Sequence, residues 1–80
     1  MEFNYSKLLG RIKEFGFTQE TLAKEIGITK ASMSLKLNNK AYFKQYEIRA
    51  ICKILNISDD EVGVYFFYSE SSENTNPKEE

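Results

Sequence analysis

The distribution of apolar and cap-forming residues along the chain predicts an all-α protein. An apolar residue, a helix-capping position and a second apolar residue four positions after the cap recur five times. This spacing is typical of the hydrophobic staple, in which the residue before a cap packs against the fourth helical residue. The pattern predicts five helices, and these cover residues 5–15, 19–26, 30–38, 45–55 and 59–65. No strand alternation is convincing outside residues 64–68.

The chain has the length of one small domain with a modest core, since it contains 80 residues. We expect the folded domain, a compact arrangement of helices, to span residues 1–68. Residues 69–80 contain no apolar anchor and carry four Glu against one Lys. This composition predicts a disordered acidic tail.

The segment of residues 18–38 has the order of residues that a helix-turn-helix requires. Ala23 is small where two helices must cross closely, and Gly27 can take the positive φ of a tight turn. Thr29 can cap the following helix. Two helices joined by such a turn present the second helix to the major groove of DNA.

The predicted helix 30–38 has two unlike faces. Met33 and Leu37 are spaced to lock one face onto the core. The opposite face is small and polar with one apolar residue, and consists of Ala31, Ser34, Leu35 and Asn38. Small side chains let a helix enter a groove about 12 Å wide. A merely polar, solvent-exposed face is the alternative.

The net charge of −1 hides an uneven distribution of charge. Residues 69–80 carry −3 and the preceding 68 residues carry +2. Between Ile26 and Tyr46 there are four lysines and no Asp or Glu. We expect this acid-free segment to attract a polyanion, with Lys36, Lys40 and Lys44 supplying sequence-independent contacts to phosphate.

No set of residues indicates catalysis. The chain has no His and a single Cys, which excludes a Cys/His zinc site and an intrachain disulfide. Asp59, Asp60 and Glu61 fall in the first turn of a predicted helix, where they complement the helix dipole. Cys52 lies on an apolar stripe, which favours a buried structural thiol over a redox sensor. We therefore expect a protein that is not an enzyme and that needs no cofactor or metal.

The chain also lacks the features of a membrane or secreted protein. No apolar run approaches the roughly 18 residues that span a bilayer, and the N-terminus has no signal-peptide pattern. We expect a cytoplasmic protein without membrane contact, in a bacterial or phage-infected host cell.

The chain resembles the lambda-repressor/Cro-like (XRE-type) helix-turn-helix family, and most of all the short phage Cro-type repressors. The stretch TQETLAKEIGITKASMSLKLNNK carries the resemblance, together with YSKLLGRIKEFGFTQ and VGVYFF. The resemblance covers about residues 6–62 and implies a five-helix DNA-binding domain. It implies that Gln19 and the loop 38–40 meet phosphate, and that the outer face of helix 30–38 reads bases. The residues expected at the DNA are Gln19, Thr29, Lys30, Ala31, Ser32, Ser34, Leu35, Asn38, Asn39, Lys40 and Lys44.

The chain departs from this family at three positions. Lys30 and Ala31 stand where the family often has Gln, so a base preference cannot be carried over. Asn39 stands where the family often has Gly. The predicted turn survives there, because Asn tolerates a left-handed conformation.

Four consecutive aromatic residues follow the last predicted helix, and these are Tyr65, Phe66, Phe67 and Tyr68. They cannot all face one core, which favours a homodimer interface. The alternative is that their edges simply graze the solvent.

These observations leave three hypotheses for the function. The leading one is a sequence-specific transcriptional regulator that binds palindromic, double-stranded operator DNA as a dimer. The second is a small phage modulator or antirepressor that binds a phage repressor protein. The third is an antitoxin that binds a toxin. The acid-free segment favours DNA, whereas the aromatic end and the acidic tail favour a protein partner.

Overall fold

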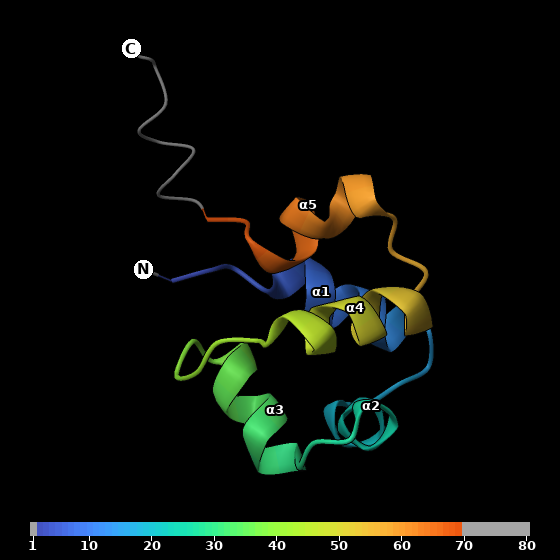
Figure 1. Ribbon diagram of the computed structural model, residues 1–80, viewed down its shortest axis with the longest axis vertical. Helices are drawn as coiled ribbons and strands as arrows, with labels where there is room; N and C mark the ends of the chain where they lie inside the picture. Colours follow the sequence, from blue (N-terminus) through green and yellow to red (C-terminus); the bar gives the residue numbers. More distant parts are fainter. Residues whose placement is uncertain (1, 70–80) are drawn as a thin grey trace.

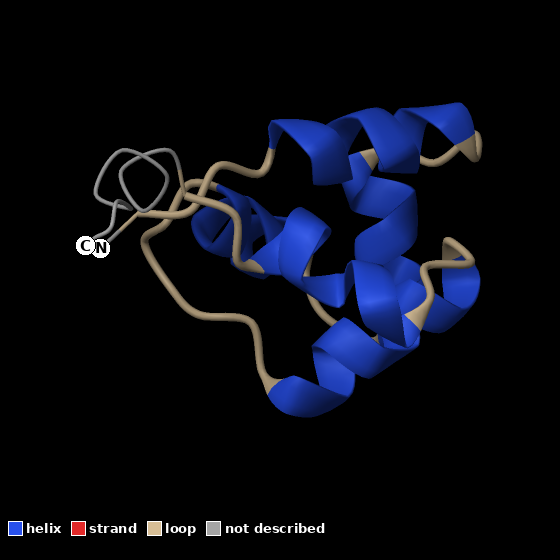
Figure 2. Cartoon of the chain, turned by 90° about the horizontal axis from the view of Figure 1, so that it is seen from above, coloured by secondary structure: helices blue, strands red, loops and turns tan. Residues whose placement is uncertain are grey.

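The computed structural model describes residues 2–69, which form five α-helices and one short 3-10 helix (Figure 1). The helices are α1 (Ser6–Glu14), α2 (Gln19–Ile26), α3 (Lys30–Leu37), α4 (Gln45–Ile54), η1 (Asp59–Glu61) and α5 (Val62–Phe66). Loops connect them, and residues 2–69 contain no strand (Figure 2). The predicted all-α fold with five helices is confirmed.

The helices pack around α1 and α4. In Figure 1, α5 lies on one side of these two helices, and α2 and α3 lie on the other side. α2 packs against α3 and α4, and α1 packs against α5. Every α-helix contributes to the core, and side chains with at most 1% exposure include Leu8, Leu22, Met33, Ile51 and Phe66.

The helix-turn-helix is built by the caps that the sequence predicts. The Thr18 hydroxyl accepts a hydrogen bond from the Thr21 backbone N–H at 3.1 Å. The Thr29 hydroxyl accepts one from the Ser32 N–H at 3.0 Å. Gly27 ends α2 at φ +82°, in the left-handed region that costs an L residue about 1–2 kcal/mol. The turn between α2 and α3 therefore follows from local sequence.

Two helix starts differ from the prediction. α1 begins at Ser6, with Tyr5 at the N-cap position, and the Asn4 side chain accepts a hydrogen bond from the Ser6 N–H at 2.9 Å. The predicted helix 59–65 is instead η1 followed by α5. Glu61 accepts a hydrogen bond from the Ser58 backbone N–H at 3.1 Å, which fixes the start of η1.

The predicted apolar stripes are only partly buried. On α1, Leu8 and Ile12 are buried, but Leu9 and Phe15 are 39% and 40% exposed. On α4, Cys52 is half-buried. The prediction that this thiol is buried is therefore wrong. These side chains lie at the edges of a core that is too small to cover a full stripe on each helix.

The two ends of the described chain meet. The Asn4 backbone N–H donates a hydrogen bond to the Tyr68 carbonyl at 2.8 Å. Ser69, the first residue of the predicted tail, is 6% exposed. The rest of the predicted tail, residues 70–80, lies outside the described residues. None of the helices within residues 2–69 is long and apolar enough to cross a membrane.

Candidate functional site

The helix α3 is anchored by one face and presents the other to solvent. Met33 is fully buried and Leu37 is 8% exposed, as the periodicity predicts. On the opposite face, Lys30, Ala31 and Leu35 are exposed, and half of the Leu35 side chain is accessible. A partner that meets α3 thus finds one charged and two apolar side chains near its start and middle.

Several polar side chains of the predicted DNA site are engaged within the chain. The Asn38 amide donates to the Ser34 carbonyl at 2.8 Å and to the Ser34 hydroxyl at 3.3 Å. The Ser32 hydroxyl accepts a hydrogen bond from the Lys36 ammonium at 3.2 Å. Gln19 is half-buried at the first position of α2. Several hydrogen-bonding groups on this face therefore already form hydrogen bonds within α3 and its C-cap.

Lys36 is not a phosphate contact, which corrects the sequence prediction. Its side chain is buried, and its ammonium lies 3.4 Å from Oε1 of Glu47, which is 1% exposed. The same oxygen accepts the Lys44 backbone N–H at 2.8 Å and so caps the start of α4. The acid-free segment ends one residue before Glu47, so the neutralising partner lies just outside it.

Asn39 takes the predicted left-handed conformation at φ +62°. Its side chain accepts a hydrogen bond from the Phe3 N–H and donates one to the Phe3 carbonyl, each at 2.9 Å. The amide is therefore engaged by the N-terminal arm, and one N–H of its Nδ2 remains outside these two hydrogen bonds. Sequence reasoning missed this contact because it joins residues 36 positions apart.

Three exposed lysines remain around α3, and they are Lys30, Lys40 and Lys44. Within residues 2–69 the ion pairs join Lys36 to Glu47 and Arg11 to Glu14, so these lysines keep their charges unpaired there. Tyr42 and Tyr46 lie among them in the sequence and are 79% and 58% exposed. The prediction missed both tyrosines, although aromatic residues between lysines in an acid-free segment are a signal for a binding face.

Three of the four aromatic side chains predicted to form an interface are buried or half-buried within the domain. Phe66 is 1% exposed and packs edge-on against Phe43 at 5.4 Å between ring centroids, so it belongs to the core of the domain. Tyr65 is half-buried against the core, and Tyr68 is half-buried with the Lys7 ammonium 4.9 Å from its ring. Phe67 alone of the four is mainly exposed, at 53%.

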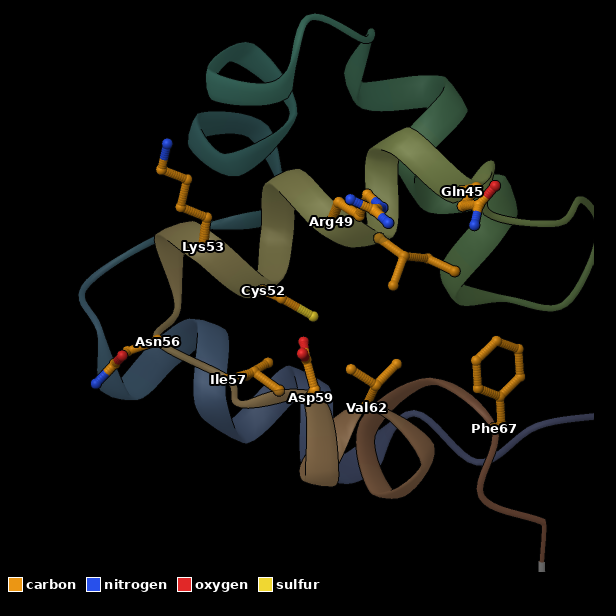
Figure 3. A pocket seen from close by; sticks show the side chains of 10 residues that line it. Gln45, Arg49, Cys52, Lys53, Asn56, Ile57, Asp59, Val62 and Phe67 are labelled. Carbon is orange, nitrogen blue, oxygen red and sulfur yellow. The ribbon is translucent and has the colours of Figure 1, made fainter.

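A groove of about 760 Å³ opens between α4 and the segment formed by η1 and α5 (Figure 3). Burial raises the pKa of the Cys52 thiol in this groove, and the negative charge of Asp59 raises it further. The thiol is therefore a poor nucleophile at neutral pH. The residues that line the groove are Gln45, Ile48, Arg49, Cys52, Lys53, Asn56, Ile57, Asp59, Val62 and Phe67.

Within residues 2–69, no three His, Cys, Asp or Glu side chains are grouped so that they could hold a metal ion.

The chain belongs to the family described as Protein of unknown function (DUF739), which matches residues 1–69. It is similar to a particular solved structure, the modulator of repression of the temperate bacteriophage TP901-1 from Lactococcus lactis. The two are 37% identical, and the similarity covers 84% of this chain and 90% of that protein, with a TM-score of 0.71. No curated protein matches the chain.

Proposed function

We propose that this chain is a small phage modulator of repression that acts by binding a repressor protein, and not by catalysis. The observation that carries the proposal is the 37% identity to a phage modulator of repression across 84% of the chain. This function lies in the cytoplasm of a bacterium or a phage-infected cell. It corresponds to the second of the three hypotheses drawn from the sequence.

Exposed apolar side chains support a protein partner. Leu35, Tyr42, Tyr46 and Phe67 are each at least 50% exposed. Tyrosine and phenylalanine are enriched at protein–protein interfaces, where they bury a large area with few rotatable bonds. A small domain gains little from leaving four such side chains in water unless a partner covers them.

The α3 face gives weaker support for the reading of bases. Among Lys30, Ala31, Ser34 and Leu35, only the lysine is charged, and the Ser34 hydroxyl already accepts the Asn38 amide. Bidentate readout of bases usually uses Arg, Lys, Asn or Gln. The resemblance to Cro-type repressors therefore stays a prediction, and so does their mode of DNA binding.

Operator binding as a homodimer is the second candidate function. The unpaired charges of Lys30, Lys40 and Lys44 favour it, because they lie at the start of α3 and in the segment between α3 and α4. Of the aromatic residues predicted to join the two protomers, Phe67 remains mainly exposed.

Titration calorimetry with the repressor encoded in the same phage genome tests the proposal. We expect a complex with a dissociation constant of about 1 μM or tighter, which corresponds to about 8 kcal/mol of binding free energy. We also expect the chain to reduce the occupancy of the operator by that repressor in a gel-shift assay. Specific binding of the chain to the operator, with no binding to the repressor, would replace this proposal with the DNA-binding candidate.

A further inference from the structure

The groove between α4 and the η1–α5 segment has an apolar floor that packs against the core and stays partly exposed. Ile48, Cys52 and Val62 are half-buried, and Phe67 is 53% exposed. In Figure 3, the Cys52 thiol, the Val62 side chain and the Phe67 ring project into the space between the two walls. These groups have room to contact further apolar atoms, whereas the core residues beneath them do not.

The two walls of the groove differ in charge. Arg49 and Lys53 lie one helical turn apart on α4, and neither belongs to an ion pair within residues 2–69. Asp59 lines the groove from η1, and its carboxylate projects toward Cys52 (Figure 3). An occupant therefore meets two cations along α4 and one anion along the opposite wall.

We infer that this groove binds an amphipathic helix of the partner protein, with acidic residues along the edge that lies against α4. The inference rests on the proposed function, because it assigns the surface by which the chain holds its repressor. An amphipathic helix lays apolar anchors at i, i+3, i+4 and i+7 into a groove, and its flanks carry the polar contacts. Carboxylates spaced i, i+4 on that helix match the spacing of Arg49 and Lys53.

This site is separate from the face of α3. The segment η1–α5 and the helix α3 lie on opposite sides of α1 and α4 (Figure 1). A helix in the groove therefore leaves Lys30, at the start of α3, uncovered by that contact. The chain can thus hold a partner by one side and keep its basic face available for a second contact.

The closing experiment compares two double variants in calorimetry with the repressor. Arg49→Glu/Lys53→Glu reverses the charge of the groove wall. Lys13→Glu/Lys24→Glu makes the same change of charge at exposed positions of α1 and α2. We expect the groove variant to weaken binding by about tenfold or more and the control by less than about threefold. Circular dichroism of both variants confirms that they are folded.

Alkylation of Cys52 gives an independent readout, because it is the only cysteine of the chain. We expect bound repressor to slow the reaction of Cys52 with N-ethylmaleimide, and the alkylated protein to bind the repressor less tightly. The inference would be overturned if Arg49→Glu/Lys53→Glu binds the repressor as tightly as the unmodified chain and bound repressor leaves the thiol reactive. The proposed function would still stand in that case.

If the repressor does not bind at all, the proposed function is overturned. A second probe then tests the groove without the repressor. The probe is a synthetic amphipathic helix with Leu anchors and Glu along one flank, compared with the same peptide carrying Lys in place of Glu. We expect the Glu peptide alone to shift the amide resonances around Cys52, Val62 and Phe67. Equal shifts or none with both peptides, or a self-association that Arg49→Glu/Lys53→Glu abolishes, would refute the acidic helix as occupant.

Discussion

At the scale of single residues, the buried pair of Lys36 and Glu47 joins α3 to α4. The ammonium and carboxylate lie 3.4 Å apart, and both side chains are almost inaccessible. Removing one member of such a pair leaves the other charge buried without a counterion. We therefore expect Glu47→Ala to lower the free energy of unfolding by about 3–5 kcal/mol, a large part of the stability of a small domain. Urea unfolding followed by circular dichroism measures this loss.

The matched control replaces both charges with apolar side chains of similar size. We expect Lys36→Met/Glu47→Leu to lie within about 2 kcal/mol of the unmodified chain, because no lone charge remains. The residual cost comes from the lost hydrogen bond of the Lys44 N–H to Glu47. A double variant as unstable as Glu47→Ala would show that the pair stabilises the domain by more than mutual neutralisation.

The reactivity of Cys52 is a second prediction at this scale. Burial and the charge of Asp59 raise the pKa of the thiol, so the folded chain holds less thiolate than a free cysteine at pH 8. We expect slow alkylation by iodoacetamide in the folded state and faster alkylation in Asp59→Asn. Asp60→Asn is the control. An equal rate in Asp59→Asn and the unmodified chain would contradict an electrostatic effect of Asp59.

The same shift links Cys52 to stability at high pH. The unfolded chain releases the thiol proton near the ordinary cysteine pKa of 9.0, whereas the folded chain retains it to a higher pH. Above that pH the unfolded state binds fewer protons than the folded state, so the contribution of Cys52 to stability falls as the pH rises. Comparing the unmodified chain with Cys52→Ser across this range isolates the effect.

At the scale of elements, Asn39 ties the loop after α3 to the N-terminal arm. Asn39 and Asn56 both have a positive φ, +62° and +54°. Asn39 also holds the Phe3 backbone by two hydrogen bonds, whereas the Asn56 side chain forms none within residues 2–69. We expect Asn39→Gly to destabilise the domain by about 1–3 kcal/mol and Asn56→Gly by less than about 0.5 kcal/mol. Thermal unfolding of the two variants gives the comparison, and equal costs would remove the role of the Phe3 contact.

The elements that the sequence predicts well are those fixed by local chemistry. Thr18, Gly27 and Thr29 set the limits of α2 and the start of α3 through contacts with residues at most four positions away. At the start of α1 the Asn4 side chain accepts from the Ser6 N–H, one residue later than the predicted start, and the break between η1 and α5 follows from no pattern in the sequence. For the same reason the sequence indicated the exposed face of α3 but missed the groove, since its walls come from two elements that meet only in the fold.

In the candidate site, burial determines which of the predicted side chains a partner can reach, and the sequence alone does not give this burial. Lys36 and Lys40 belong to the same acid-free segment, yet the first is buried against Glu47 and the second is exposed. Phe66 and Phe67 are neighbours in the aromatic run, yet only the first is in the core. Composition gives the number of charges and rings, whereas their accessibility follows from tertiary contacts.

At the scale of the whole molecule, charge is distributed so that an overall net charge of −1 coexists with a basic face. Lys30, Lys40 and Lys44 are exposed around α3 without an ion pair in residues 2–69. The second positive site, Arg49 with Lys53, lies on the wall of the groove. These two basic surfaces give one small domain two separate places at which an acidic partner can bind.

The last prediction tests the basic face directly on random-sequence DNA. We expect weak, sequence-independent binding whose affinity falls with salt, because each phosphate contact contributes about 0.9 to the slope of log affinity against log salt. Lys30→Gln/Lys40→Gln/Lys44→Gln should lower that slope by up to about 2.7. Lys36→Met/Glu47→Leu should leave it unchanged, because Lys36 is buried and neutralised. Fluorescence anisotropy across a salt series measures the slopes. If the triple variant keeps the slope of the unmodified chain, the lysines around α3 do not contact DNA, and this face is left to protein partners alone.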